Sequence, residues 1–98
     1  MGEALEVVRF TVPREEREAF LRDRPAAIAA LRDRFDGLLD ATLAELDDGT
    51  WIDVLRWRSR EEALAAAEQF ASVPDAAAWA SRITEVREMI HGEIRDAL

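Results

Sequence analysis

The sequence contains no cysteine, no lysine and a single histidine, His91, among its 98 residues. Because cysteine is absent, the chain forms no disulfide, offers no thiolate nucleophile and binds no metal through sulfur. Because lysine is absent, Schiff-base chemistry is excluded. One histidine cannot supply a metal site built from several imidazoles. These absences remove most of the side chains on which covalent and metal-dependent catalysis relies.

Glycine and serine are also few, and neither forms a catalytic motif. The four glycines are scattered, so the chain has no glycine-rich loop that cradles a phosphate. None of the three serines, Ser59, Ser72 and Ser81, lies in a G-x-S-x-G motif. The remaining chemistry is acid–base catalysis by carboxylates and arginine, or shape-based binding of an apolar ligand. The sequence therefore predicts that the protein uses no cofactor and no metal.

Negative charge predominates, because thirteen arginines stand against twenty-one aspartates and glutamates, for a net charge of −8. Such a charge repels phosphate backbones and anionic lipids, so we expect neither nucleic acid nor a membrane as partner. No segment approaches the ~20 apolar residues that span a bilayer. The first residues lack the basic region of a signal peptide, which predicts a cytoplasmic location.

Four segments have the composition of β-strands. Residues 5–12, 38–46 and 51–57 are rich in β-branched and aromatic side chains and carry apolar residues on both faces. An Asp-Asp-Gly-Thr turn joins the second and third segments into a hairpin. Residues 84–96 fit either a helix or a strand with a bulge at Gly92. The strand is favoured, because it completes a split sheet.

Helical segments occupy the rest of the chain. Pro25 interrupts the first of them, which predicts a kink or two short helices at residues 14–23 and 25–35. Ser59, with a glutamate three residues later, forms a capping box that begins the next helix. Pro74 then precedes a short helix that ends near residue 83.

The order of these elements, β-α-β-β-α-β, predicts an α+β fold of the ferredoxin-like kind: one domain over residues 1–98 with a four-stranded antiparallel sheet. The helices of such a domain cover one face of the sheet, and the other face should be polar. Three strands are nevertheless apolar on both faces. The simplest explanation is that the second face is buried against another copy, so we predict a homodimer with Trp51 at its interface.

Several segments carry a family resemblance. They are residues 7–13 (VVRFTVP), 48–54 (DGTWIDV) and above all 57–63 (WRSREEA), followed by the run from Pro74 to His91. Over nearly its whole length the chain resembles the antibiotic biosynthesis monooxygenase (ABM) family of the dimeric α/β-barrel superfamily. The resemblance implies a dimeric α/β barrel whose ligand pocket lies between the sheet and the helices of each protomer.

Known activities of the ABM family include cofactor-free oxygenation of aromatic polyketides and oxidative breakdown of haem. The polyketide oxygenases use an asparagine four residues before a tryptophan, together with an arginine; this chain keeps Trp57 but has Asp53 in place of the asparagine. The asparagine and histidine of the haem-degrading members fall near Val8 and on Ala67. Neither catalytic set is intact, which argues against haem breakdown and leaves oxygenation open.

Asp53 and Trp57 lie four residues apart on one strand and therefore on the same face. A carboxylate among large apolar groups holds a proton more readily, because its charged form is desolvated, and it can act as a general base. Such a base would deprotonate a phenol or an anthrone, whose carbanion reacts with dioxygen without a metal. The alternative, which we favour, is that Asp53 pairs with an arginine such as Arg9 on the neighbouring strand.

Four further residues are candidates for ligand contact. Trp57 is a stacking platform for a planar ligand or a core residue, and Trp79 on the short helix is a candidate pocket wall. His91 is either an acid–base residue in the cavity or a structural hydrogen-bond partner. Arg9 anchors an anionic group of the ligand or neutralises Asp53.

Two functions are consistent with these residues. The first is a homodimeric, cofactor-independent monooxygenase, or a related isomerase, that acts on an aromatic or polyketide-like small molecule. The second is a non-catalytic, ligand-binding or regulatory homodimer of the same fold. The absence of asparagine and tyrosine favours the second, whereas Asp53, Trp57 and His91 favour the first.

Overall fold

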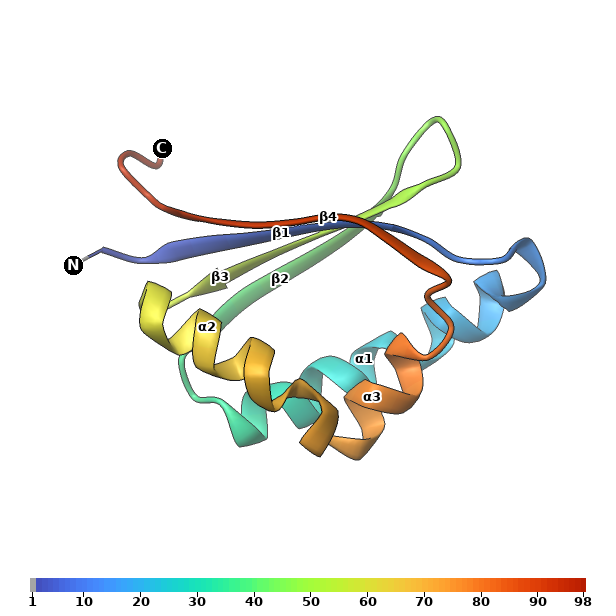
Figure 1. The fold of residues 1–98 in the computed structure, drawn as a ribbon, viewed down its shortest axis with the longest axis horizontal. Helices are drawn as coiled ribbons and strands as arrows, with labels where there is room; N and C mark the ends of the chain where they lie inside the picture. The colour runs from blue at the N-terminus through green and yellow to red at the C-terminus, as the bar shows by residue number, and fades with distance from the viewer. Residues whose placement is uncertain (1) are drawn as a thin grey trace.

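The four predicted strands form one antiparallel sheet in the computed structural model, which describes residues 2–98. The first residue of the predicted domain lies outside the described residues. The strands are arranged in the order β2-β3-β1-β4 (Figure 1). They comprise β1 Ala4–Thr11, β2 Leu38–Glu45, β3 Trp51–Trp57 and β4 Glu85–Glu93. The ferredoxin-like order of elements is thereby confirmed.

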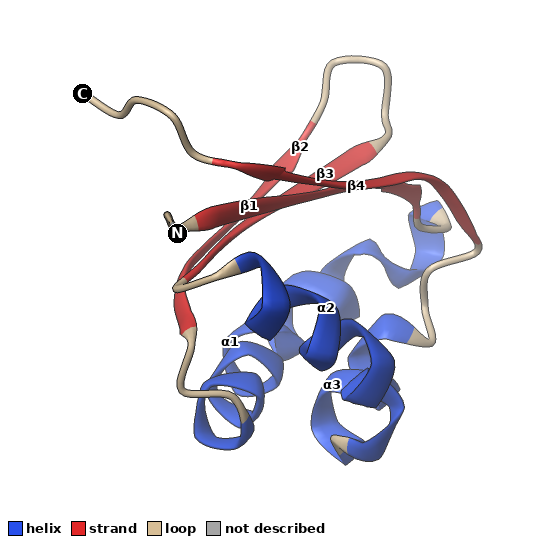
Figure 2. Cartoon of the chain, turned by 60° about the vertical axis from the view of Figure 1, so that its left-hand side comes forward, coloured by secondary structure: helices blue, strands red, loops and turns tan. Residues whose placement is uncertain are grey.

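The described helices all lie on one face of the sheet (Figures 1 and 2). They pack as a layer in which α1 and α3 lie side by side and α2 covers the sheet near the other end. None of these helices combines the length and the apolar character needed to cross a bilayer. The helical elements comprise η1 Arg14–Glu16, α1 Arg17–Arg34, α2 Arg60–Gln69, η2 Phe70–Ser72 and α3 Pro74–Ala80.

Helix α1 continues through Pro25, so the prediction of two separate helices is wrong. Proline cannot donate to the carbonyl four residues earlier, and in a helix interior this costs about 3 kcal/mol. The buried residues of α1 lie on both sides of the proline: Phe20 before it, and Ala27 and Leu31 after it. Burial of this shared face outweighs the local loss, because most helix stability in proteins comes from tertiary packing.

Turn and capping signals in the sequence are confirmed. Gly49 adopts a φ of 87° in the β2–β3 hairpin, a conformation that glycine adopts at little cost. The Asp48 side chain accepts a hydrogen bond from the Thr50 backbone N–H at 2.9 Å and braces the same turn. At the start of α2, Ser59 Oγ accepts the backbone N–H of Glu62 at 3.2 Å.

The C-terminal segment is a strand, as favoured, and β4 pairs with β1 along its length. The register shifts between Arg9 and Phe10 of β1, where the partner positions skip Arg87. Gly92 pairs regularly with Leu5, so the predicted bulge at Gly92 is wrong. The irregularity lies near the start of β4, where the strand bends toward the helical layer (Figure 1).

An aromatic cluster joins the sheet to the helices at one end of the core. Phe20 of α1 stacks on Trp79 with ring centroids 4.5 Å apart. Its ring also meets Trp51 and Phe10 edge-on, at centroid distances of 5.3 and 5.7 Å. Trp51 is only 3% exposed within the single chain, so its predicted place at a subunit interface is wrong. The tryptophan packs in the core because its strand position faces the helices.

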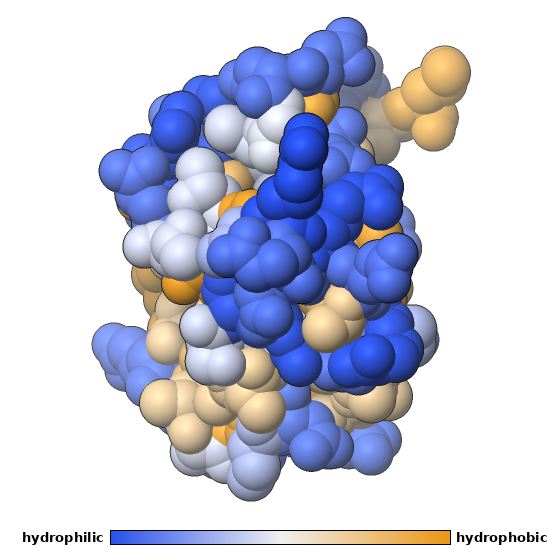
Figure 3. All heavy atoms as spheres, turned by 90° about the vertical axis from the view of Figure 1, so that its right-hand side faces the viewer, coloured by the Kyte–Doolittle hydropathy of each residue, from blue (hydrophilic) through white to orange (hydrophobic). Residues whose placement is uncertain are grey.

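Charged side chains form ion pairs on the outer surface. Arg17 meets Glu45 at 2.9 Å, and Arg82 meets Asp23 at 3.0 Å. The end of the molecule viewed in Figure 3 is mainly hydrophilic, with apolar atoms in smaller areas between the charged groups. Exposed ion pairs of this kind contribute little to stability, so the core decides the fold.

The second face of the sheet carries none of the described helices and combines a group of apolar side chains with charged ones such as Arg9 and Glu88. Side chains alternate along β3, so that Trp51, Asp53, Leu55 and Trp57 are buried toward the helices while the residues between them face the other way. We call this second surface the open face. Its apolar residues are Leu5 and Val7 of β1, Ile52 and Val54 of β3, and Ile90 of β4. Apolar side chains on both faces are therefore confirmed for β1 and β3. The prediction is wrong for β2, which presents Asp40, Thr42 and Ala44 on the open face.

Candidate functional site

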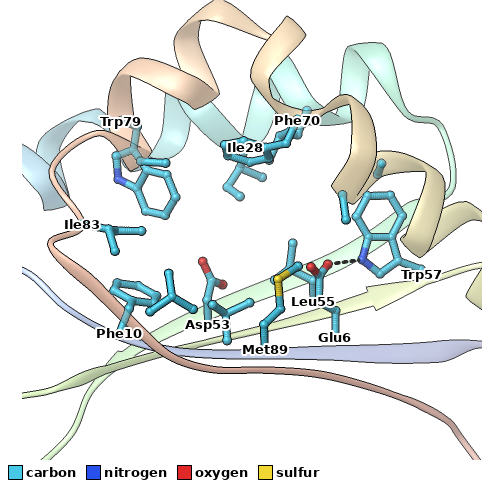
Figure 4. A pocket seen from close by; sticks show the side chains of 16 residues that line it. Glu6, Phe10, Ile28, Asp53, Leu55, Trp57, Phe70, Trp79, Ile83 and Met89 are labelled. Atoms are coloured by element: carbon cyan, nitrogen blue, oxygen red, sulfur yellow. Dashed lines mark hydrogen bonds between the residues drawn. The ribbon is translucent and has the colours of Figure 1, made fainter.

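A pocket of about 290 Å³ lies between the sheet and the helical layer (Figure 4). Strands β1, β3 and β4 form its floor, and residues of α1, α2, η2 and α3 contribute to its roof. Fourteen of its sixteen lining residues are apolar, and the other two are Glu6 and Asp53. A mostly apolar cavity with a few polar groups is the usual form of a small-molecule site.

Two tryptophans form opposite ends of the pocket, as Figure 4 shows. Trp57 Nε1 donates to Glu6 Oε1 at 2.9 Å, and Trp79 Nε1 donates to the backbone oxygen of Phe20 at 2.9 Å. Each indole is therefore held by its only polar atom, and its ring is fixed as a flat wall. The structure places both tryptophans where the sequence suggested pocket walls.

Asp53 faces the pocket but is already paired. Arg24 of α1 donates hydrogen bonds to both carboxylate oxygens of Asp53, from Nη2 to Oδ1 at 2.9 Å and from Nη1 to Oδ2. The two side chains are only 11% and 7% exposed, and the Arg24 guanidinium also lies 5.2 Å from the centre of the Trp79 ring. Pairing of Asp53 with an arginine was the favoured alternative. The partner, however, is Arg24 rather than Arg9.

Arg9 is directed away from the pocket. Its neighbours Val8 and Phe10 line the cavity, and alternation along β1 places Arg9 on the open face. There its Nη2 lies 3.4 Å from Asp48 Oδ2 in the hairpin. Of the residues that the structure describes, Arg9 is not among those lining the pocket, so it is not available to a ligand bound there.

Glu6 is the pocket residue that the sequence analysis missed. It lies on β1, is 6% exposed, and presents its carboxylate beside Trp57 (Figure 4). Burial raises the pKa of Glu6 above its ordinary value; the Trp57 hydrogen bond and the charge of His91 act against this, and the charge of Asp53 adds to it. The sequence did contain a signal for this position, because alternation along the strand puts Glu6 on the same face as the apolar residues Val8 and Phe10.

His91 lies beside Glu6 rather than in the pocket lining of the described chain. The two residues are direct partners across the β1–β4 ladder. His91 Nε2 lies 3.7 Å from Glu6 Oε2, is buried, and has no hydrogen-bond partner among the described residues. The site thus contains a carboxylate held by arginine at one end and a carboxylate beside an imidazole at the other.

Within residues 2–98, no group of three or more histidine, aspartate or glutamate side chains is placed to share a metal ion. The polar groups of the site are two carboxylates, one guanidinium and one imidazole. Such groups move protons and hold oxygen atoms of a ligand. The chemistry that this arrangement can perform with its own residues is therefore acid–base chemistry.

Fold and pocket together define a ferredoxin-like α+β domain with a mostly apolar pocket between its sheet and its helices. The family model described as antibiotic biosynthesis monooxygenase matches residues 4–80. The chain therefore belongs to this family, and the resemblance seen in its sequence motifs is confirmed. The sequence matches no curated protein.

Solved structures with the same fold cover nearly the whole chain. SnoaB from Streptomyces nogalater, described as a cofactor-independent oxygenase, is 23% identical, with a TM-score of 0.75 over 100% of this chain and 98% of SnoaB. MupZ from Pseudomonas fluorescens is 13% identical, with a TM-score of 0.75 over 97% of this chain and 74% of MupZ. Rv0793 from Mycobacterium tuberculosis is 20% identical, with a TM-score of 0.62 over 98% of this chain and 96% of the Rv0793 chain. At these identities the similarities show a shared fold and nothing further.

Proposed function

We propose that the protein is a cofactor-independent monooxygenase that oxidises a planar aromatic, polyketide-like small molecule in the pocket between sheet and helices. The observation that carries this proposal is an apolar cavity of about 290 Å³ with a tryptophan at each end and two carboxylates in its lining. Membership of the antibiotic biosynthesis monooxygenase family supports it. The description of SnoaB as a cofactor-independent oxygenase agrees with it.

The reaction would begin with removal of a proton from an acidic methylene such as that of an anthrone. The resulting carbanion is delocalised over the fused rings and gives its electrons to dioxygen, forming a carbon–oxygen bond and a peroxide at that carbon. Loss of water from the peroxide leaves a carbonyl. One oxygen atom ends in the product and the other in water, whose two hydrogens come from the methylene, so neither metal nor flavin is consumed.

The two ends of the pocket would hold such a substrate in one orientation. Trp57 and Trp79 give flat apolar surfaces for the rings. The Arg24–Asp53 pair lies at the Trp79 end and can bind a carbonyl or hydroxyl oxygen of the ligand. Because Asp53 is engaged by Arg24 through both oxygens, we assign it to binding rather than to proton removal.

Oxygen uptake with a panel of anthrones tests this function. We expect consumption of one dioxygen per anthrone oxidised, faster than the background oxidation in buffer. The variant Ile28→Trp places a large ring in the roof of the pocket and should abolish this difference. Leu64→Trp, on the 41% exposed outer surface of α2, is the matched control and should retain activity. Equal rates for the wild type, Ile28→Trp and buffer would reject the function for these substrates.

A ligand-binding role without turnover is the second candidate, and the occupied carboxylate of Asp53 favours it. Binding of an anthraquinone should quench the fluorescence of Trp57 and Trp79, which line the pocket. Quenching with a saturable curve, combined with no oxygen uptake above background, would favour this role over the oxygenase.

We further propose that the protein is a homodimer joined through its open face. Leu5, Val7, Ile52 and Val54 form a contiguous apolar surface across β1 and β3, and Ile90 of β4, next to Val7, is 52% exposed. Contiguous exposed apolar patches in monomers are usually small, and larger ones mark interaction sites. A second copy offers the same surface, so a two-fold arrangement would bury both faces at once.

A further inference from the structure

Glu6, Trp57 and His91 form a connected group at one end of the pocket. Trp57 Nε1 donates to one oxygen of Glu6 at 2.9 Å, while His91 Nε2 lies 3.7 Å from the other. Glu6 lies on the central strand β1, between Trp57 of β3 and His91 of β4. Three neighbouring strands therefore hold the group in place, and Glu6 is the member of the Glu6–His91 pair that reaches the cavity.

The two carboxylates of the pocket differ in their partners. Asp53 is matched by the full guanidinium charge of Arg24, which bonds both of its carboxylate oxygens. Glu6 receives one hydrogen bond, from the neutral indole of Trp57, and has no arginine within ion-pair distance among the described residues. The ionisable groups that act on it are Asp53 and His91. A buried carboxylate accepts a proton readily when few hydrogen bonds or opposite charges offset the loss of hydration of its charged form.

His91 offers a place for that proton to go. Its Nε2 is buried and makes no hydrogen bond within the described chain, which is unusual for a buried polar atom. Glu6 Oε2 lies in front of it, slightly beyond hydrogen-bond length. Once a proton sits on either group, a contraction of less than 1 Å would form a charge-assisted hydrogen bond between them.

We propose that Glu6 is the proton acceptor of the pocket and that His91 shares the proton it takes, a role that for the natural substrate rests on the proposed function. In the step, a carbon–hydrogen bond of the ligand breaks and its electron pair stays on the ligand carbon. The proton bonds to Glu6 Oε2, and a hydrogen bond from that oxygen to His91 Nε2 then holds it. Glu6 is thus a catalytic residue, and His91 is a positioning residue.

A Kemp elimination tests Glu6 without oxygen and without the natural substrate. The probe is 5-nitrobenzisoxazole, a flat aromatic compound whose ring C–H is removed by a base. Its N–O bond breaks in the same step and a coloured cyanonitrophenolate forms. A positioned general base contributes about 100-fold or more. We therefore expect the wild type to exceed Glu6→Gln by at least about 100-fold.

Matched variants separate this role from an effect on the fold. Glu6→Gln keeps a side-chain oxygen that can accept the Trp57 indole, so the pocket should stay intact. Glu88→Gln makes the same chemical change on β4, on the open face opposite Arg9, and should react like the wild type. Circular dichroism checks that both variants are folded.

The protonation of Glu6 can also be measured without catalysis, from the indole N–H signal of Trp57, one of only three tryptophans in the chain. The indole N–H of Trp57 bonds to Glu6, so its NMR signal should move as that carboxyl loses its proton. We expect the midpoint to lie above that of an ordinary glutamate, because burial raises the pKa of Glu6. A hydrogen bond from protonated Glu6 to His91 stabilises the protonated carboxyl, so His91→Gln should move the midpoint, and the inflection of the Kemp rate with pH, to lower pH. Loss of the His91 charge alone would move both to higher pH. A purely structural His91 would leave both unchanged.

Each outcome decides a separate question. Equal Kemp rates in the wild type and Glu6→Gln would overturn the role of Glu6, as would a Trp57 signal that titrates at the ordinary position of a glutamate. An unmoved midpoint in His91→Gln, or one moved to higher pH, would overturn the role of His91. If Glu6→Gln failed to fold, the wild-type titration would still decide. Kemp activity that depends on Glu6, together with no oxygen uptake from anthrones, would reject the oxygenase and keep the proton acceptor.

Discussion

Arg24 and Asp53 are 29 residues apart in the chain, yet the Arg24 guanidinium bonds both carboxylate oxygens of Asp53, which lines the pocket. The pair connects α1 to β3 and lies against Trp79. Buried ion pairs are costly to desolvate, and removal of one partner is worse than removal of both. This relationship accounts for an acid in a cavity that is otherwise almost entirely apolar.

The ion pair leads to a prediction about stability. Arg24→Met leaves the Asp53 carboxylate buried without its partner, so the free energy of unfolding should fall by about 3–5 kcal/mol. The double variant Arg24→Met with Asp53→Leu removes both charges and should recover most of this loss. Urea denaturation at neutral pH measures both. A double variant no more stable than Arg24→Met would contradict this account of the pair.

Glu6 predicts a pH-dependent difference in stability. Its pKa is raised in the folded state, so between its unfolded and folded values the native protein binds more protons than the unfolded chain. Stability from this residue is therefore fully present below the unfolded pKa and is lost as pH rises through the folded pKa. The free energy of unfolding of the wild type should fall relative to Glu6→Gln over that window.

Comparison with Glu6→Gln is needed because other carboxyls act in the opposite sense. Hydrogen bonds from Arg17 and Arg22 lower the pKa values of Glu45 and Asp23, whose contributions are present at higher pH and are lost as pH falls. The difference between wild type and variant cancels these contributions. A difference that stays flat with pH would show that burial of Glu6 does not perturb its ionisation.

The open face predicts the state of assembly. Sedimentation of the wild type at micromolar concentration should give a mass of about twice the 11.1 kDa of one chain. Val54→Arg places a charge in the middle of the open face and should yield monomers. Leu64→Arg on the outer surface of α2 is the control and should remain dimeric. A wild type that sediments at 11.1 kDa would contradict the homodimer.

Two glycines make a matched pair for backbone and side-chain effects. A methyl group at Gly37 would collide with the carboxylate of Glu62, which is held by Arg58 at 2.7 Å. A methyl group at Gly92 would meet no atom within 4 Å. Gly37→Ala should therefore lower the melting temperature. Gly92→Ala should raise stability by roughly 0.5 kcal/mol or more, because glycine weakens a strand. A raised melting temperature for Gly37→Ala, or a lowered one for Gly92→Ala, would contradict this prediction.

Much of the fold could be predicted from local patterns. Strands β1, β2 and β3, the hairpin at Gly49 and the cap at Ser59 all follow from the preferences of neighbouring residues, and each is present. Strand β4 was favoured only because it completes the sheet. The continuous helix through Pro25 could not be predicted in this way. Burial of Phe20 and Leu31 on the same side of α1 depends on a sheet whose strands lie elsewhere in the sequence.

The site could be predicted only in part. Trp57 and Trp79 were identified as pocket walls, because large aromatic residues at strand and helix positions that face the core tend to line any cavity there. Arg9 was chosen as the partner of Asp53 because it lies on a neighbouring strand. Alternation along β1 instead places it on the opposite face.

By itself, the sequence determined the order of elements, the excess of negative charge and the apolar residues on both faces of β1 and β3. These follow from residue type and spacing, which act over a few positions along the chain. The tertiary structure alone decided that Arg24 meets Asp53 and that Glu6 lies between Trp57 and His91. Such contacts depend on strand register and helix placement, which are set by packing between segments that are distant in sequence.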